Sequence, residues 1–132
     1  DIKRKGHDVT IVSFGKIIKE AYKAAEVLEK DGISCEIIDL RTVRPLDYNT
    51  VFESVKKTNR LVVLEEAWPF GNVATDITYQ VQQHLFDYLD APVEKINTAD
   101  TPAPYSPVLL KEWLPNSENV ISAVKKVLYV KA

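Results

Sequence analysis

Several residue types are scarce in this chain of 132 residues, which contains no methionine, one cysteine and four glycines. The single cysteine, Cys35, excludes an intramolecular disulfide and a multi-cysteine zinc site. No apolar run approaches the roughly 18 residues that cross a bilayer, and no signal-peptide pattern opens the chain. Because the chain starts without methionine on a polar stretch, we expect an excerpt of a longer protein. Residues 1–7 are predicted to be a remnant of an interdomain linker, and residues 8–132 a single domain.

A strong charge of one sign is also missing. Seventeen basic and nineteen acidic side chains give a net charge of −2. Residues 1–60 carry twelve basic and ten acidic groups, and residues 61–132 carry five and nine. This balance argues against nucleic acid as a partner and is too even to indicate a membrane surface.

Apolar segments, by contrast, are frequent, since 45% of the residues are hydrophobic. Short β-branched runs alternate with segments in which apolar residues recur every three or four positions. The runs predict strands over residues 8–14, 33–40, 60–65 and 92–97, and the periodic segments predict helices over about 17–30, 47–58, 73–89 and 117–128. Such alternation is typical of an α/β fold with a mainly parallel sheet in three α/β/α layers. Residues 98–116 contain four of the seven prolines and are expected to be irregular.

Three segments contain residues that could form a site. Ser13, Gly15 and Lys16 follow the first strand and precede a helix, a place where free N–H groups and a lysine can hold an anion; a tight turn with a solvated lysine is the simpler interpretation. Arg41 and Arg44 belong to a loop that is either a docking site or an internal ion-pair network. Glu65 and Glu66 could form an acid–base pair, but adjacent residues of a strand point to opposite faces and need not share a site. Exposed aromatic residues at a loop tip favour an interface, so Glu66, Trp68 and Phe70 indicate an interface more than a catalytic site.

The remaining reactive side chains give no active site. Cys35 lies in an apolar strand and is predicted to be a buried thiol. His84 is predicted to be a surface residue of a helix, and neither histidine belongs to a cluster with metal-ligand spacing. Composition and residue spacing therefore indicate an α/β domain but no complete active site. For this domain we predict no catalytic residue, no bound cofactor and no metal.

Longer motifs resemble one enzyme family. The segment Glu36-Ile-Ile-Asp-Leu-Arg-Thr-Val-Arg-Pro-Leu-Asp47 resembles the C-terminal domain of transketolase-type enzymes. Three later stretches are similar to the beta subunits of pyruvate dehydrogenases, and the resemblance spans residues 6 to 130. These stretches are Ser54-Val-Lys-Lys-Thr-Asn-Arg-Leu-Val-Val-Leu-Glu-Glu-Ala-Trp-Pro69, Phe86-Asp-Tyr-Leu-Asp-Ala-Pro92 and Ala99-Asp-Thr-Pro-Ala-Pro-Tyr105. The resemblance implies a transketolase C-terminal-type domain over residues 8–132.

The resemblance also implies an activity for the parent enzyme. That enzyme would be an α2β2 heterotetramer that uses thiamine diphosphate and magnesium to decarboxylate pyruvate and acetylate the lipoyl group of dihydrolipoyl acetyltransferase. In the family the alpha subunit holds the diphosphate and the metal, and the N-terminal domain of the beta subunit supplies the activating glutamate and a catalytic histidine. This domain is therefore expected to be inactive by itself. Bacterial cytoplasm is the expected compartment, and the mitochondrial matrix is compatible with the same sequence.

Family resemblance further implies partners. The C-terminal domains of two beta subunits pack about a two-fold axis and bind the basic peripheral-subunit-binding domain of the acetyltransferase. By motif, the contacting carboxylate is Asp90, and the end of the family's beta subunit matches Val130. Here the chain continues through Lys131 and Ala132.

Two alternatives remain. The first is the matching domain of a branched-chain 2-oxoacid dehydrogenase or of a transketolase, although Arg44-Pro-Leu-Asp47 and Glu66-Ala-Trp-Pro69 look more like the pyruvate enzyme than the branched-chain enzyme. A receiver-like signalling domain shares the α/β plan, but it needs clustered acids after the first strand, where this chain has Ser13-Phe14-Gly15.

Overall fold

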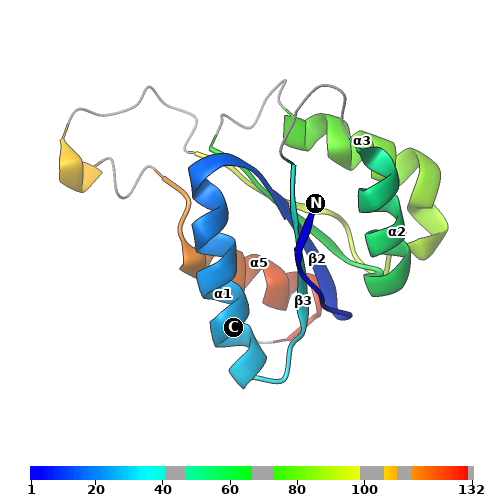
Figure 1. Cartoon of the computed structure of the whole chain (residues 1–132), viewed down its shortest axis with the longest axis horizontal. Coiled ribbons are helices and arrows are strands. Elements are labelled where there is room, and N and C mark those ends of the chain that lie inside the picture. Colours follow the sequence, from blue (N-terminus) through cyan, green and yellow to red (C-terminus); the bar gives the residue numbers. More distant parts are fainter. Residues whose placement is uncertain (41–46, 67–72, 99–105, 110–113, 131–132) are drawn as a thin grey trace.

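The computed structural model describes residues 1–40, 47–66, 73–98, 106–109 and 114–130, which form one sheet with helices on both faces (Figure 1). Its strands are β1 (Ile2–Arg4), β2 (Val9–Ser13), β3 (Cys35–Asp39), β4 (Leu61–Leu64) and β5 (Glu94–Ile96). Its helices are α1 (Ile18–Lys30) preceded by the 3-10 turn η1 (Gly15–Ile17), α2 (Tyr48–Thr58), α3 (Val73–Leu85) followed by η2 (Phe86–Tyr88), and α5 (Ser117–Val127).

The strand order is β1-β3-β2-β4-β5. Strands β2 to β5 run parallel to their neighbours, and only the pairing of β1 with β3 is antiparallel. Helices α1 and α5 lie on one side of the sheet and α2 and α3 on the other (Figure 1). The predicted three-layer α/β/α architecture with a mainly parallel sheet is therefore confirmed.

Alternation along the strands divides the core into two parts. Ile11 and Ile37 pack with α1 and α5, whereas Val12 and Ile38 pack with α2 and α3, and all four side chains are fully buried. Consecutive residues of a strand point to opposite faces, so a continuous apolar run serves both layers. Burying each such side chain contributes about 1.5–3 kcal/mol, which makes the central strands the main source of stability.

The first residues of the chain differ from the expectation. The sequence predicts a linker remnant over residues 1–7. In the structure, Ile2–Arg4 form an edge strand that pairs with Ile37 and Ile38 of β3. Two of the three residues of β1 are basic, which hides the strand from a search for apolar runs, and charge is common on edge strands because it discourages further pairing.

Two other segments also differ in detail. The helix expected over 73–89 ends at Leu85 and continues as η2, because tertiary hydrogen bonds from Asn59 to the Tyr88 carbonyl and from the Asp90 N–H to the Asn59 carbonyl replace helical ones. Within the stretch 98–116, expected to be irregular, residues 107–109 form a helical turn.

Side chains cap the starts of two helices. Asp47, the N-cap of α2, accepts a hydrogen bond from the Thr50 N–H at 3.1 Å. Asn116 and Asn119 form a reciprocal capping box at the start of α5. Among the described residues, no helix combines the length and the apolarity required to cross a bilayer.

Candidate partner-docking site

Three segments meet where β4 and β5 begin: the turn after α2, the turn before β5 and the chain after α5. We call the residues Asn59, Arg60, Asp90, Tyr129 and Val130 the docking edge. The Asp90 N–H donates to the Asn59 carbonyl at 2.9 Å, and the Tyr129 hydroxyl donates to the Asp90 carbonyl at 3.4 Å. Asp90 and Val130, which sequence reasoning selected separately, thus lie at the same edge of the sheet.

The turn after α2 is organised by Asn59. This residue has a left-handed backbone (φ 65°), which asparagine tolerates better than most residues, and its N–H donates to the Val55 carbonyl. Its side-chain amide donates to the Tyr88 carbonyl at 2.8 Å. Asn59 therefore ties the end of α2 to the segment that carries Asp90.

Arg60 connects the same turn to α5. Its Nε donates to the carbonyl of Val127 at 3.1 Å, and its Nη2 lies 3.7 Å from Oδ2 of Asp90. The Asp90 side chain is 56% exposed, so this ion pair contributes under about 1 kcal/mol and leaves the carboxylate accessible to solvent.

The end of α5 is a Schellman turn. The Val130 N–H donates to the Lys125 carbonyl at 2.9 Å, and the Tyr129 N–H donates to the Lys126 carbonyl at 3.1 Å. Tyr129 occupies the left-handed position of this motif with φ 57°, where glycine is usual. Both side chains are exposed, Tyr129 by 72% and Val130 by 49%.

Sequence reasoning missed Asn59, Arg60 and Tyr129. An asparagine directly after the predicted end of α2 is a signal for a left-handed helix cap, and it could have located the turn. Nothing in the sequence marks Tyr129, because tyrosine is unfavourable at the position that it occupies.

The proposed anion site lies at the opposite ends of the strands. Ser13 is fully buried and its hydroxyl has no hydrogen-bond partner among the described residues, Gly15 has φ 71°, and Lys16 is exposed. Gly15 provides the tight turn that precedes α1, in agreement with the simpler interpretation. Anion binding by these residues stays a prediction.

The adjacent carboxylates after β4 have different environments. Glu65 is fully buried and accepts hydrogen bonds from the Ala74 N–H at 3.2 Å and the Asn97 amide at 2.7 Å, whereas Glu66 is exposed. Burial raises the pKa of Glu65, and these two hydrogen bonds and the charge of Lys95 oppose that rise. The two carboxylates do not form a shared acid–base pair.

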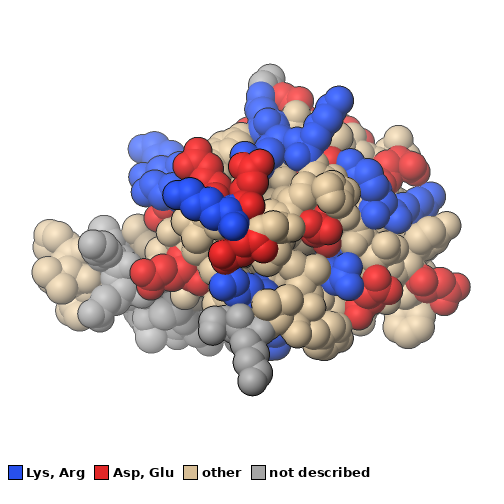
Figure 2. Space-filling view, turned by 90° about the horizontal axis from the view of Figure 1, so that it is seen from below, with Lys and Arg blue, Asp and Glu red and all other residues tan. Residues whose placement is uncertain are grey.

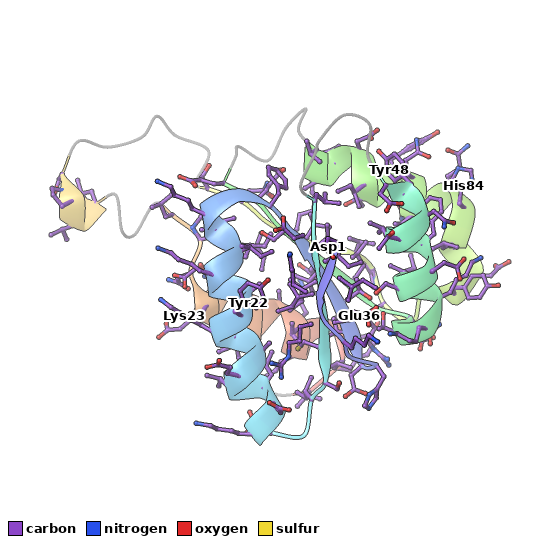
Figure 3. All side chains as sticks on the ribbon, viewed as in Figure 1. Asp1, Tyr22, Lys23, Glu36, Tyr48 and His84 are labelled. Carbon is purple, nitrogen blue, oxygen red and sulfur yellow. The ribbon has the colours of Figure 1, made fainter. Side chains whose placement is uncertain are left out.

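Two of the remaining candidates are described by the structure. Burial raises the pKa of Cys35 to about 12, which makes it a poor nucleophile. His84 is exposed on α3, and its ring centroid lies 5.4 Å from that of Phe52 (Figure 3). The other candidates, Arg41, Arg44, Trp68 and Phe70, lie outside the described residues.

Polar clefts also occur away from the docking edge. A cleft of about 370 Å³ lies beside α2 with Glu36, Ser54 and Lys57 in its wall, and one of about 490 Å³ separates β5 from α5. Within the described ranges, no group of three or more His, Cys, Asp or Glu side chains is placed to hold a metal ion.

Comparison with known proteins assigns the family. Residues 1–120 match the family described as "Transketolase, C-terminal domain". The chain belongs to this family. The match begins at residue 1, so the family domain includes β1 and the rest of the segment that was expected to be linker.

Two curated relatives and one solved structure illustrate this family's range. The chain is 51% identical over 130 residues to "Pyruvate dehydrogenase E1 component subunit beta" of Rickettsia bellii, covering 98% of this chain and 40% of that protein. It is 54% identical over 128 residues to the protein of the same name from Rhizobium meliloti, covering 97% and 28%. A structure named "Split gene transketolase, inactive beta4 tetramer" superposes with a TM-score of 0.84 at 27% identity, covering 100% of this chain and 42% of that one. The chain thus spans about two fifths or less of these relatives.

Proposed function

We propose that this chain is the C-terminal assembly and partner-docking domain of a pyruvate dehydrogenase beta subunit. The observation that carries the proposal is identity above 50%, across nearly the whole chain, to two proteins with that name. The parent enzyme would decarboxylate pyruvate and transfer the acetyl group to a lipoyl group of dihydrolipoyl acetyltransferase. A second beta subunit, an alpha subunit and the peripheral-subunit-binding domain of the acetyltransferase would be its partners.

Thiamine diphosphate and magnesium would belong to other parts of the parent enzyme. In the part of the chain that the structure describes, no group of three or more His, Cys, Asp or Glu side chains is placed to hold a metal ion. We derive no catalytic step through either group from this domain. The relatives include bacterial and mitochondrial proteins, and we propose the bacterial cytoplasm as the compartment, with the mitochondrial matrix as the alternative.

Docking is proposed at the docking edge because this edge presents an accessible carboxylate beside exposed apolar groups. Asp90 is suited to a basic partner, and Tyr129 and Val130 provide contact area next to it. The face seen in Figure 2 has acidic and basic side chains interspersed rather than one broad charged field. Short-range contacts at a few residues would therefore decide recognition more than long-range steering.

Replacing Asp90 by asparagine is expected to weaken docking about tenfold or more, because the partner's basic side chain loses its counter-charge. The fold should persist, since the Asp90 backbone bond to Asn59 remains and the lost ion pair with Arg60 is exposed. The measurement is calorimetric titration of the full-length enzyme with the peripheral-subunit-binding domain at low and moderate salt.

Glu26→Gln is the matched control, because Glu26 is an exposed carboxylate on α1. It should bind the partner domain with unchanged affinity and lose the same overall charge. Equal affinities for wild type, Asp90→Asn and Glu26→Gln would remove the docking proposal, leaving assembly between subunits as the role of the domain.

Transketolase is the second candidate for the parent activity, and the structural similarity to a split-gene transketolase favours it. A branched-chain 2-oxoacid dehydrogenase is the third. Turnover by the full-length enzyme of pyruvate, 2-oxoisovalerate or a ketose phosphate distinguishes the three.

A further inference from the structure

The backbone at Tyr129 is unusual. Among the non-glycine residues that the structure describes, two have a left-handed conformation, Asn59 and Tyr129, and both belong to the docking edge. Asparagine visits this region readily, but for a bulky side chain it is a genuine outlier. A glycine would form the same Schellman turn without this conformational cost.

The fold gains little from the tyrosine in return. Its side chain is 72% exposed, so the ring buries little apolar surface. Among the described residues its hydroxyl has one hydrogen-bond partner, the Asp90 carbonyl, and this bond is long at 3.4 Å. Unfavourable conformations that bring no packing benefit concentrate at functional sites, and this one holds an exposed aromatic ring whose hydroxyl reaches the backbone of Asp90.

We propose that Tyr129 and Asp90 together receive an arginine side chain of the docked partner domain. The inference rests on the docking function proposed above and names the chemistry of that same site. A guanidinium can pair with a carboxylate while its plane stacks on an aromatic ring, and lysine lacks the planar group that does both. Tyr129 is thus a specificity-determining contact in addition to the charged residue.

The position of Arg60 supports a contribution of the Tyr129 ring in addition to the Asp90 charge. Its Nε holds the carbonyl of Val127, which fixes the end of α5 directly before the Tyr129 segment. Its charge lies 3.7 Å from the Asp90 carboxylate and offsets part of the attraction that a partner's cation would feel. Because charge alone is weakened in this way, contact with the Tyr129 ring would supply a substantial part of the recognition.

Tyr129→Gly separates docking from folding, because the two properties should move in different directions. Glycine relieves the left-handed backbone, so the melting temperature of the full-length enzyme should stay the same or rise. Affinity for the peripheral-subunit-binding domain, measured by calorimetry, should fall roughly tenfold with the loss of the ring. Tyr129→Phe should bind like wild type, since it keeps the ring and loses only the hydroxyl.

A control and a partner variant complete the experiment. Tyr79→Ala removes another exposed ring, on α3, and should leave affinity unchanged. Each arginine of the partner domain is also replaced by lysine in turn. At one position this replacement should lower the affinity as much as Tyr129→Gly does.

Three results would overturn the inference. If Tyr129→Gly binds like wild type while Asp90→Asn does not, the tyrosine contact is wrong and the docking function stands. If neither variant changes affinity, both proposals fail. If Tyr129→Gly loses melting temperature together with affinity, the residue has a structural role only.

Discussion

Replacing Gly6 by alanine is expected to destabilise the domain by about 3 kcal/mol or more. A Cβ at this position would lie 2.3 Å from the carbonyl carbon of Cys35 and 2.5 Å from the backbone nitrogen of Glu36. Cys35 starts β3 and pairs with Val9 of β2, so its backbone cannot move away without disturbing the ladder between β2 and β3. Gly6 is thus required for space.

Gly15→Ala is the matched control, since this glycine is required for a different reason. A Cβ at Gly15 would meet no atom within 4 Å, but its φ of 71° is unfavourable for alanine, at a cost of about 1–2 kcal/mol. Urea unfolding of the 132-residue chain, followed by circular dichroism, gives both free energies. Equal losses for the two variants would mean that β1 yields readily, and the close approach at Gly6 would not be essential.

The regular elements of this domain could be predicted from sequence because their signals are local. Apolar runs such as that around Ile11 occupy both faces of one strand, and Asp47 caps α2 through a residue three positions away. Helix and strand bounds differ by a few residues where tertiary bonds intervene, as at the end of α3.

The docking edge could be predicted only in part. Family motifs selected Asp90 and Val130, but the contacts that unite them join residues far apart in the chain, such as Arg60 with Val127. The left-handed backbone of Tyr129 is opposed to the preference of tyrosine, so no propensity argument leads to it. Residue preferences fail to predict the backbone where a residue occupies a conformation that it disfavours, and such positions are frequent at functional sites.

Glu36→Ala is expected to cost about 3 kcal/mol at neutral pH, because it removes the acceptor of the Ser54 hydroxyl and of the Gly6 N–H and leaves a cavity. Glu36 lies in β3 with 1% exposure and faces α2 (Figure 3). It accepts hydrogen bonds from the Ser54 hydroxyl at 2.5 Å, from the Gly6 N–H at 3.2 Å and from Lys57. Lys57 is 48% exposed, so its charge stays hydrated in the variant, and the cost arises from Ser54, Gly6 and the cavity.

The pH dependence of this contribution has a definite sign. Burial raises the pKa of Glu36, but the hydrogen bonds from Lys57, Ser54 and Gly6 and the charge of Lys57 outweigh it, so the pKa lies below its ordinary value. The stabilisation is therefore complete above the unfolded pKa of about 4.3 and is lost as the pH falls through the lower folded value. Free energies of unfolding for wild type and Glu36→Gln should converge as the solution is acidified.

Glu65→Gln provides a control of opposite sign. Because burial raises the pKa of Glu65, the folded state binds that proton more tightly than the unfolded state does. Wild type then loses stability as the pH rises through the unfolded and then the folded pKa, and the glutamine variant gains relative to it. Urea unfolding of wild type and both variants between acidic and neutral pH gives the difference in free energy of unfolding between each variant and wild type. As the pH rises, this difference should move in opposite directions for the two variants. If it moves in the same direction for both, the pKa of at least one of the two buried carboxylates is not shifted as its surroundings predict.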